Sequence, residues 1–144
     1  MKRYFVLILA LLALAIASGC SAPANLDVAM SHITREHGYT VVMVPPARPP
    51  AINKIHSWKI KLASANGTPI THARITVDGG MPQHGHGLPT QPQVTKELED
   101  GTYLLEGMKF SMTGWWEIKL SIETDAGIDK VTFNTVVTSP VAAN

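Results

Sequence analysis

Two histidines and a methionine lie on a short stretch rich in glycine and proline, from Gly79 to Thr90. His84 and His86 are separated by one residue, and Met81 precedes them. Imidazole nitrogen and thioether sulfur together suit a soft or borderline metal ion, copper above all. Glycine and proline are disfavoured inside helices and central strands, which predicts a loop with little cover over the imidazoles. The stretch predicts a copper site; the alternative is a tight connection whose histidines only face water.

A further methionine follows the predicted strand Tyr103–Phe110. Strand alternation places Met108, Phe110 and Met112 on one face, and the turn after Phe110 is expected at the same end of the fold as the histidine loop. Two imidazoles with one or two thioethers suit Cu(I) and tolerate Cu(II) when water joins. Zinc fits less well, because structural zinc needs four closed ligands and the mature core has no cysteine. The alternative for these methionines is ordinary filling of core gaps, and it is the interpretation expected for Met108. The expected ligands are His84, His86, Met112 and Met81.

The elements that must position these ligands are short strands. Several stretches are rich in β-branched residues or alternate between apolar and polar residues, with turn signals about every ten residues and no sustained helical period. This pattern predicts an all-β fold, an immunoglobulin-like antiparallel β-sandwich of about seven strands. Trp58, Trp116 and Phe133 are expected to fill its middle in place of a disulfide. The tyrosine-corner-like contact is expected from Gly101-Thr102-Tyr103 or Gly114-Trp115-Trp116. The predicted strands are Tyr39–Val44, Lys54–Ala63, Ala73–Asp78, Gln93–Leu98, Tyr103–Phe110, Trp115–Glu123 and Lys130–Thr138.

The N-terminus has the pattern of a secretory signal. A positive start is followed by an apolar run from Tyr4 to Ile16, which is shorter than the roughly 20 residues of a membrane span. The sequence Ala17-Ser18-Gly19-Cys20 then resembles the lipobox of bacterial lipoproteins. The resemblance implies that residues 1–19 are a signal peptide and that Cys20 becomes the first mature residue and carries lipid. The alternative is an ordinary signal peptide with an incidental cysteine.

Residues 20–38 have no clean period and are predicted to be a lipid-anchored tether, with a short helical turn at most. His32 and His37 lie in this range and are expected to be solvated. The β-sandwich domain is then expected over residues 39–144. His56 begins the buried face of its strand, and it is expected to be a core-edge histidine hydrogen-bonded to the backbone.

Length and charge exclude some classes of protein. The 144 residues suit one domain, and a formal charge of +1 gives no polybasic field for nucleic acid. Removing residues 1–19 takes away Lys2 and Arg3, so 12 basic side chains become 10 against 11 acidic ones, a net charge of −1. The chain has no Gly-x-Ser-x-Gly motif and no phosphate-binding glycine loop before a helix, so we expect no enzymatic activity. A non-catalytic interaction or assembly module without metal is the alternative function, with outward-facing Trp115 as a partner-binding aromatic. The alternative for Trp115 is a cap over the histidine loop.

The segment Met81–Thr90 resembles the signature of the FixH/YtkA-like family. Gly101-Thr102-Tyr103, Phe110-Ser111-Met112 and Gly114-Trp115-Trp116 fit the same pattern, and the resemblance covers roughly residues 39–138. It implies a small copper-handling β-sandwich outside the cytoplasmic membrane, in a family linked with respiratory-oxidase assembly or copper handling. This chain departs from FixH proper in having a lipobox-like signal, which favours metal handling at the envelope surface over oxidase assembly.

Together these features predict an envelope lipoprotein that binds copper for handling or delivery. Its expected partners are the membrane, through the lipid, and an envelope protein that donates or receives copper. The expected location is the periplasmic face, at the outer membrane if the cell has one, because Ser21 after the cysteine supplies no aspartate retention signal.

Lipid anchoring is tested by Cys20→Ser. The variant should lose metabolic lipid labelling and partition into the aqueous phase of a detergent extraction, because the only thiol is gone. Identical partitioning of the variant and the original protein would contradict a lipid anchor at this residue.

Overall fold

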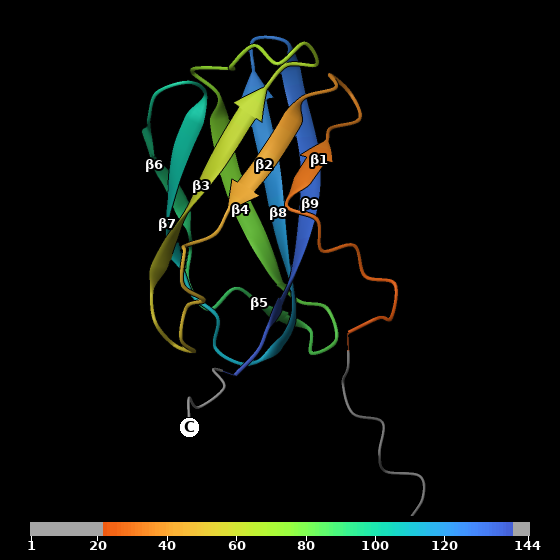
Figure 1. The fold of residues 1–144 in the computed structure, drawn as a ribbon, viewed down its shortest axis with the longest axis vertical. Helices are drawn as coiled ribbons and strands as arrows, with labels where there is room; N and C mark the ends of the chain where they lie inside the picture. Colours follow the sequence, from red (N-terminus) through yellow and green to blue (C-terminus); the bar gives the residue numbers. More distant parts are fainter. Residues whose placement is uncertain (1–21, 140–144) are drawn as a thin grey trace, which may run out of the picture.

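The structure, a computed structural model, describes residues 22–139. Regular structure in this range is all β-strand, and it forms two antiparallel sheets packed into a sandwich (Figure 1). One sheet has the strand order β1-β2-β3-β7-β6, and the other has the order β5-β4-β8-β9. The all-β sandwich predicted from the sequence is confirmed. The strands are β1 (Ser31–Ile33), β2 (Thr40–Val44), β3 (His56–Ala63), β4 (Arg74–Met81), β5 (His86–Gly87), β6 (Gln93–Glu97), β7 (Thr102–Met108), β8 (Gly114–Thr124) and β9 (Gly127–Val137).

The core lies between the sheets and follows the predicted alternation. Every second residue of β3 is buried from Trp58 to Leu62, and β8 buries Trp116 and the alternate residues up to Ile122. Phe133 of β9 completes the predicted aromatic filling, since it is fully buried together with Trp116. No helix in residues 22–139 has the length and apolar character needed to cross a membrane.

The sandwich begins earlier in the chain than predicted. β1 pairs with β2 through Ser31↔Val42 to Ile33↔Thr40, so part of the expected tether is an edge strand. The expected solvated histidines are also placed differently: the His32 ring lies 4.7 Å from the Phe133 ring, and His37 bonds to Asp129. The expectation that both histidines are solvated was wrong, because their partners Phe133 and Asp129 lie on β9, far along the chain, and no local pattern shows those contacts. The predicted signal peptide and Cys20 lie outside the described residues.

Tyr103 makes the tyrosine-corner-like contact. Its hydroxyl donates to the carbonyl oxygen of Ile70 at 2.8 Å and accepts from the backbone N–H of Ala73 at 3.1 Å. Burial raises the pKa of the Tyr103 phenol, so it stays protonated and able to donate. The contact ties β7 to the segment that leads into β4, and therefore joins the two sheets.

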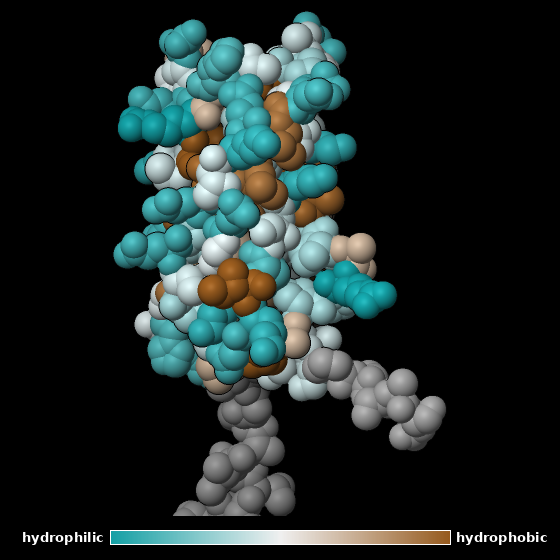
Figure 2. Space-filling view, turned by 90° about the vertical axis from the view of Figure 1, so that its left-hand side faces the viewer, coloured by the Kyte–Doolittle hydropathy of each residue, from teal (hydrophilic) through white to brown (hydrophobic). Residues whose placement is uncertain are grey.

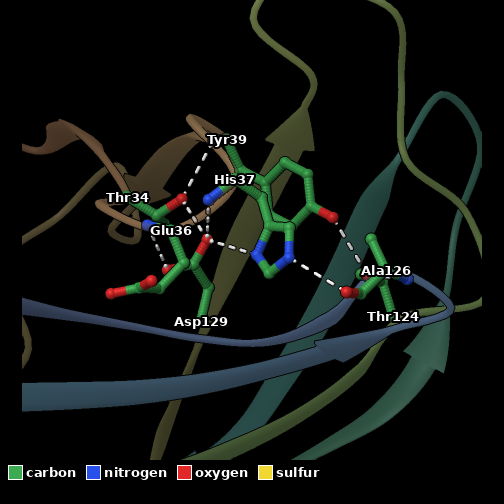
Figure 3. A network of polar contacts seen from close by, with 7 residues as sticks. All are labelled: Thr34, Glu36, His37, Tyr39, Thr124, Ala126 and Asp129. Carbon is green, nitrogen blue, oxygen red and sulfur yellow. Dashed lines mark hydrogen bonds and ion pairs between the residues drawn. The ribbon is translucent and has the colours of Figure 1, made fainter.

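A buried carboxylate holds the β1–β2 connection against the other sheet (Figure 3). Asp129 of β9 is 1% exposed and accepts hydrogen bonds from Thr34 Oγ1 at 2.6 Å and from the backbone N–H groups of Glu36 and His37 at 3.1 and 3.0 Å. The His37 ring places Nδ1 3.2 Å from the same carboxylate and Nε2 3.0 Å from the carbonyl oxygen of Ala126. Figure 3 shows Thr34, Glu36 and His37 contacting Asp129, and the His37 ring lying between Asp129 and Ala126.

The edge strand β6 carries polar side chains on its outer surface. β6 is an edge strand with Gln93, Thr95 and Lys96 exposed. Figure 2 shows this side of the molecule, where hydrophilic side chains predominate and apolar ones lie between them. Charged and polar side chains on an edge strand oppose edge-to-edge pairing with another chain.

The Asp129 cluster predicts an acid-sensitive stability. Burial by itself would raise the pKa of Asp129, but the hydrogen bonds from Thr34, Glu36 and His37 outweigh it and the pKa is lowered. Its stabilising effect is therefore present above the ordinary carboxyl range near ~4 and is lost as pH falls through the lowered pKa. Asp129→Asn should reduce the free energy of unfolding by about 1–3 kcal/mol at neutral pH, because donors lose their acceptor.

Urea unfolding of the full chain from neutral to acid pH measures this effect. The difference between Asp129→Asn and the original protein should shrink as pH falls below ~4, because the carboxylate is protonated first in the unfolded state and then, through its lowered pKa, in the folded state. Asp125→Asn, at an exposed turn position nearby, is the matched control and should leave the profile unchanged. A constant difference between Asp129→Asn and the original protein at all pH values would contradict the role of the charge.

Candidate metal centre

The histidine loop is a hairpin built on a central strand. β4 continues through Gly79 and Gly80 to Met81, and it pairs with β8 on one side and with β5 on the other. The sequence had predicted no central strand here, and that was wrong. Both glycines have φ near +155°, and a Cβ would lie 2.1 Å from Glu117 O at Gly79 and 2.0 Å from His86 O at Gly80. The strand passes between its neighbours because these two residues lack a side chain.

The hairpin brings the two imidazoles together. The rings of His84 and His86 stack with their centroids 5.9 Å apart and their planes at 27°. Metal–nitrogen bonds of about 2.0–2.1 Å place each ring centroid roughly 3 Å from a bound ion, so two rings sharing one ion lie up to about 6 Å apart. His84 is half-buried and His86 is exposed. The pair is therefore accessible from solvent, and its centroid separation is within the reach of one ion once the rings turn their nitrogens toward it.

Backbone hydrogen bonds hold the hairpin in this form. The N–H of His84 donates to Met81 O at 3.1 Å, and the N–H of Leu88 donates to Gly79 O at 3.1 Å. Gly85 has φ +63° between the two histidines, a left-handed conformation that glycine adopts most readily. The local sequence thus turns the chain tightly while both imidazoles remain on its outside.

The two predicted thioethers are placed differently from each other. Met81 is 1% exposed in the core, and a Cβ on Gly114 would lie 3.0 Å from its Cε. Its sulfur therefore packs behind the hairpin against the start of β8. Met112 is 37% exposed, and its carbonyl oxygen accepts a hydrogen bond from Trp116 Nε1 at 3.1 Å. The indole anchors the Met112 backbone while the side chain reaches the surface.

Strand directions bring these segments to one end of the sandwich, which we call the β5 end (Figure 1). β4 runs antiparallel to β8, so Met81 at the end of β4 is near the start of β8, and Met112 lies just before that start. The expectation that the histidine loop and the turn after Phe110 share one end is confirmed. Within residues 22–139, no three side chains of the His, Cys, Asp and Glu types are close enough to hold a metal ion together.

Comparison with known proteins identifies the domain. The family model described as YtkA-like matches residues 34–121, more than half of the chain. The chain belongs to the YtkA-like family. The match runs from the β1–β2 connection into β8, so it includes the hairpin and Met112. Searches of curated proteins and of solved structures found no match.

Two polar features of this YtkA-like domain were not predicted as functional. Asp129 stands in phase with Val131 and Phe133 on the inward face of β9, and an acidic residue in that phase is the sequence signal that was missed. His56 was expected to bond to the backbone, and this is confirmed by its Nδ1, 3.1 Å from Lys54 O. What the sequence did not reveal is that its other nitrogen, Nε2, is buried without a hydrogen-bond partner in the described residues.

The predicted outward aromatic is also partly engaged. Trp115 is half-buried, and its Nε1 donates to Asn134 Oδ1 on β9 at 2.9 Å. The side chain of Asn134 in turn donates to Asp27 O at 2.8 Å. Trp115 therefore helps to fix the N-terminal segment on the outer face of this sheet.

The hairpin geometry predicts unequal effects of two glycine substitutions. Gly80→Ala should lower the free energy of unfolding by more than about 2 kcal/mol, because its Cβ meets backbone that cannot move aside easily. In Gly85→Ala the new Cβ has no atom within 4 Å, so the free energy of unfolding should fall by only about 1 kcal/mol, the strain of a left-handed backbone at alanine. Denaturant unfolding of the full chain measures both. Equal destabilisation by the two variants would contradict the close approach of β4 and β5.

Proposed function

We propose that this YtkA-like protein is an envelope lipoprotein that binds copper on the β4–β5 hairpin, for metal handling or delivery. The observation that carries the proposal is the pair of imidazoles of His84 and His86 at 5.9 Å on an accessible turn. Imidazole is a good copper ligand, and its neutral form binds through a nitrogen lone pair. The bound species is a cargo ion in this proposal, and the protein performs no catalysis.

Thioethers would set the preference for oxidation state. Met112 carries an accessible sulfur at the same end of the sandwich, and soft thioether ligands select Cu(I). Met81, whose side chain is in the core, would coordinate only an ion drawn beneath the hairpin. We therefore place Met112 before Met81 in the ligand set that joins the two imidazoles.

Location and partner follow from the N-terminal sequence. A lipid on Cys20 would hold the domain at a membrane surface, and the segment before β1 would act as the short tether. A copper protein held there would exchange its ion with an envelope protein that donates or receives copper. An exposed site with few ligands favours such exchange, because an incoming ligand can reach the ion.

A metal-free interaction module is the second candidate function. The observation favouring it is an open groove of about 300 Å³ between the β2–β3 connection and the end of β9. Prolines of the connection line it together with Trp58 and Phe110. A partner protein could contact such a surface whether or not copper binds elsewhere, because these residues are separate from the histidine hairpin.

Competition titration of the full-length protein in detergent against a Cu(I) chelator tests copper binding. The double variant His84→Ala/His86→Ala should lose the hairpin site, because both accessible imidazoles are removed. Met112→Leu keeps the side-chain volume and removes the sulfur, so it should weaken Cu(I) more than Cu(II).

His72→Ala is the matched control. The His72 side chain is 92% exposed and lies 3.7 Å from Glu97 on another part of the surface, so its removal should leave copper affinity unchanged. A double variant with undiminished copper stoichiometry and affinity would exclude the hairpin site. No copper uptake by the original protein would leave the interaction module as the function.

A further inference from the structure

A second group of soft donors lies at the β5 end of the sandwich, away from the histidine hairpin. His56, the first residue of β3, pairs with Met108, the last residue of β7, and the register of the two strands shifts between this pair and Trp58. Opposed residues of antiparallel strands project from the same face with Cβ atoms about 4.5–5.5 Å apart. An imidazole and a thioether are therefore neighbours here, and both belong to residues that face the inside of the sandwich.

The hydrogen bonding of His56 determines which nitrogen can act as a ligand. Nδ1 lies 3.1 Å from the carbonyl oxygen of Lys54, and a carbonyl oxygen only accepts, so Nδ1 carries the proton. The lone pair of the neutral ring is then on Nε2. A hydrogen bond from the far nitrogen to a backbone carbonyl is the arrangement that orients metal-binding histidines.

Nε2 has nothing to bond to in the described part of the chain. It is buried and has no hydrogen-bond partner, and the same holds for the indole Nε1 of neighbouring Trp58. Burial lowers the pKa of His56, with the Lys54 carbonyl opposing in part, so the ring is neutral at neutral pH and needs no deprotonation to bind a metal ion. A buried acceptor without a partner is costly in a folded protein, which is a reason to look for a ligand.

The surroundings suit a soft ion of low charge. The His56 ring lies 5.3 Å from the ring of Phe110 and 6.4 Å from that of Trp58, and Met108 is fully buried. Aromatic faces attract cations and exclude water, whereas a hard divalent ion requires carboxylate or carbonyl oxygens. Thioether with imidazole is the donor set of Cu(I) and of the chemically similar Ag(I).

We propose that His56 Nε2 and the Met108 sulfur form a second binding site for a soft monovalent ion of the Cu(I) and Ag(I) class, shielded by the rings of Trp58 and Phe110. The site uses none of the hairpin residues and does not rest on copper binding there. His56 is half-buried at the open end of the sandwich, so a small rotation of its ring gives an ion access to Nε2.

Silver nitrate titration of full-length His84→Ala/His86→Ala protein in detergent tests the second site in isolation. We expect one Ag(I) to bind, with a change in tryptophan fluorescence because Trp58 borders the site. Adding Met108→Leu, which keeps the volume and removes the sulfur, should weaken Ag(I) binding about tenfold or more. Adding His56→Ala should abolish it, and adding His72→Ala should change nothing.

A direct readout keeps the test decisive if His56→Ala does not fold. Long-range ¹H–¹⁵N spectra of the histidine rings in the original protein should show the His56 Nε2 resonance shifting on Ag(I) addition while Nδ1 stays protonated. An unshifted Nε2 resonance at saturating Ag(I) would overturn the proposal, and so would Ag(I) affinity that Met108→Leu leaves unchanged. If the original protein bound silver and the His84→Ala/His86→Ala protein did not, this second site would be refuted and the hairpin site would remain.

Discussion

The carboxylate of Asp129 is the constraint on which the N-terminal third of this fold depends. A buried negative charge is stable only if donors surround it, and here they come from Thr34, Glu36 and His37, more than 90 residues earlier in the chain. These contacts fix the β1–β2 connection against β9. They therefore turn a segment without clear periodicity into the edge of a five-stranded sheet.

The opposite end of the sandwich depends on the absence of side chains. Gly79 and Gly80 let β4 lie against the backbones of Glu117 and His86, closer than any Cβ would allow. The hairpin that follows is held by the sheet and does not hang free as a loop. Its histidines consequently have a defined separation, and defined separation of ligands is what a binding site for one ion requires.

Imidazole and thioether groups gather at this β5 end from strands of both sheets. His84, His86 and Met81 come from the β4–β5 hairpin, whereas His56 and Met108 come from β3 and β7. Strand direction explains the gathering, because antiparallel strands alternate their starts and ends. The YtkA-like family match includes all of these residues. Both proposed sites use imidazole and thioether ligands, which suit soft ions such as Cu(I) and Ag(I).

The sequence was enough to predict where the strands lie and which of their residues face the core, because alternation is a local property. In β3, the alternation of Trp58, Ile60 and Leu62 with polar residues identifies the buried face whichever strand lies beside it. The His-Gly-His spacing likewise marked a candidate site. Only the tertiary structure decided that Met81 is core and Met112 is surface, that β4 extends through two glycines, and that His56 keeps an unpartnered nitrogen. Each of these features depends on contacts between residues far apart in the chain. The pairing of distant strands sets those contacts, and no local sequence pattern encodes that pairing.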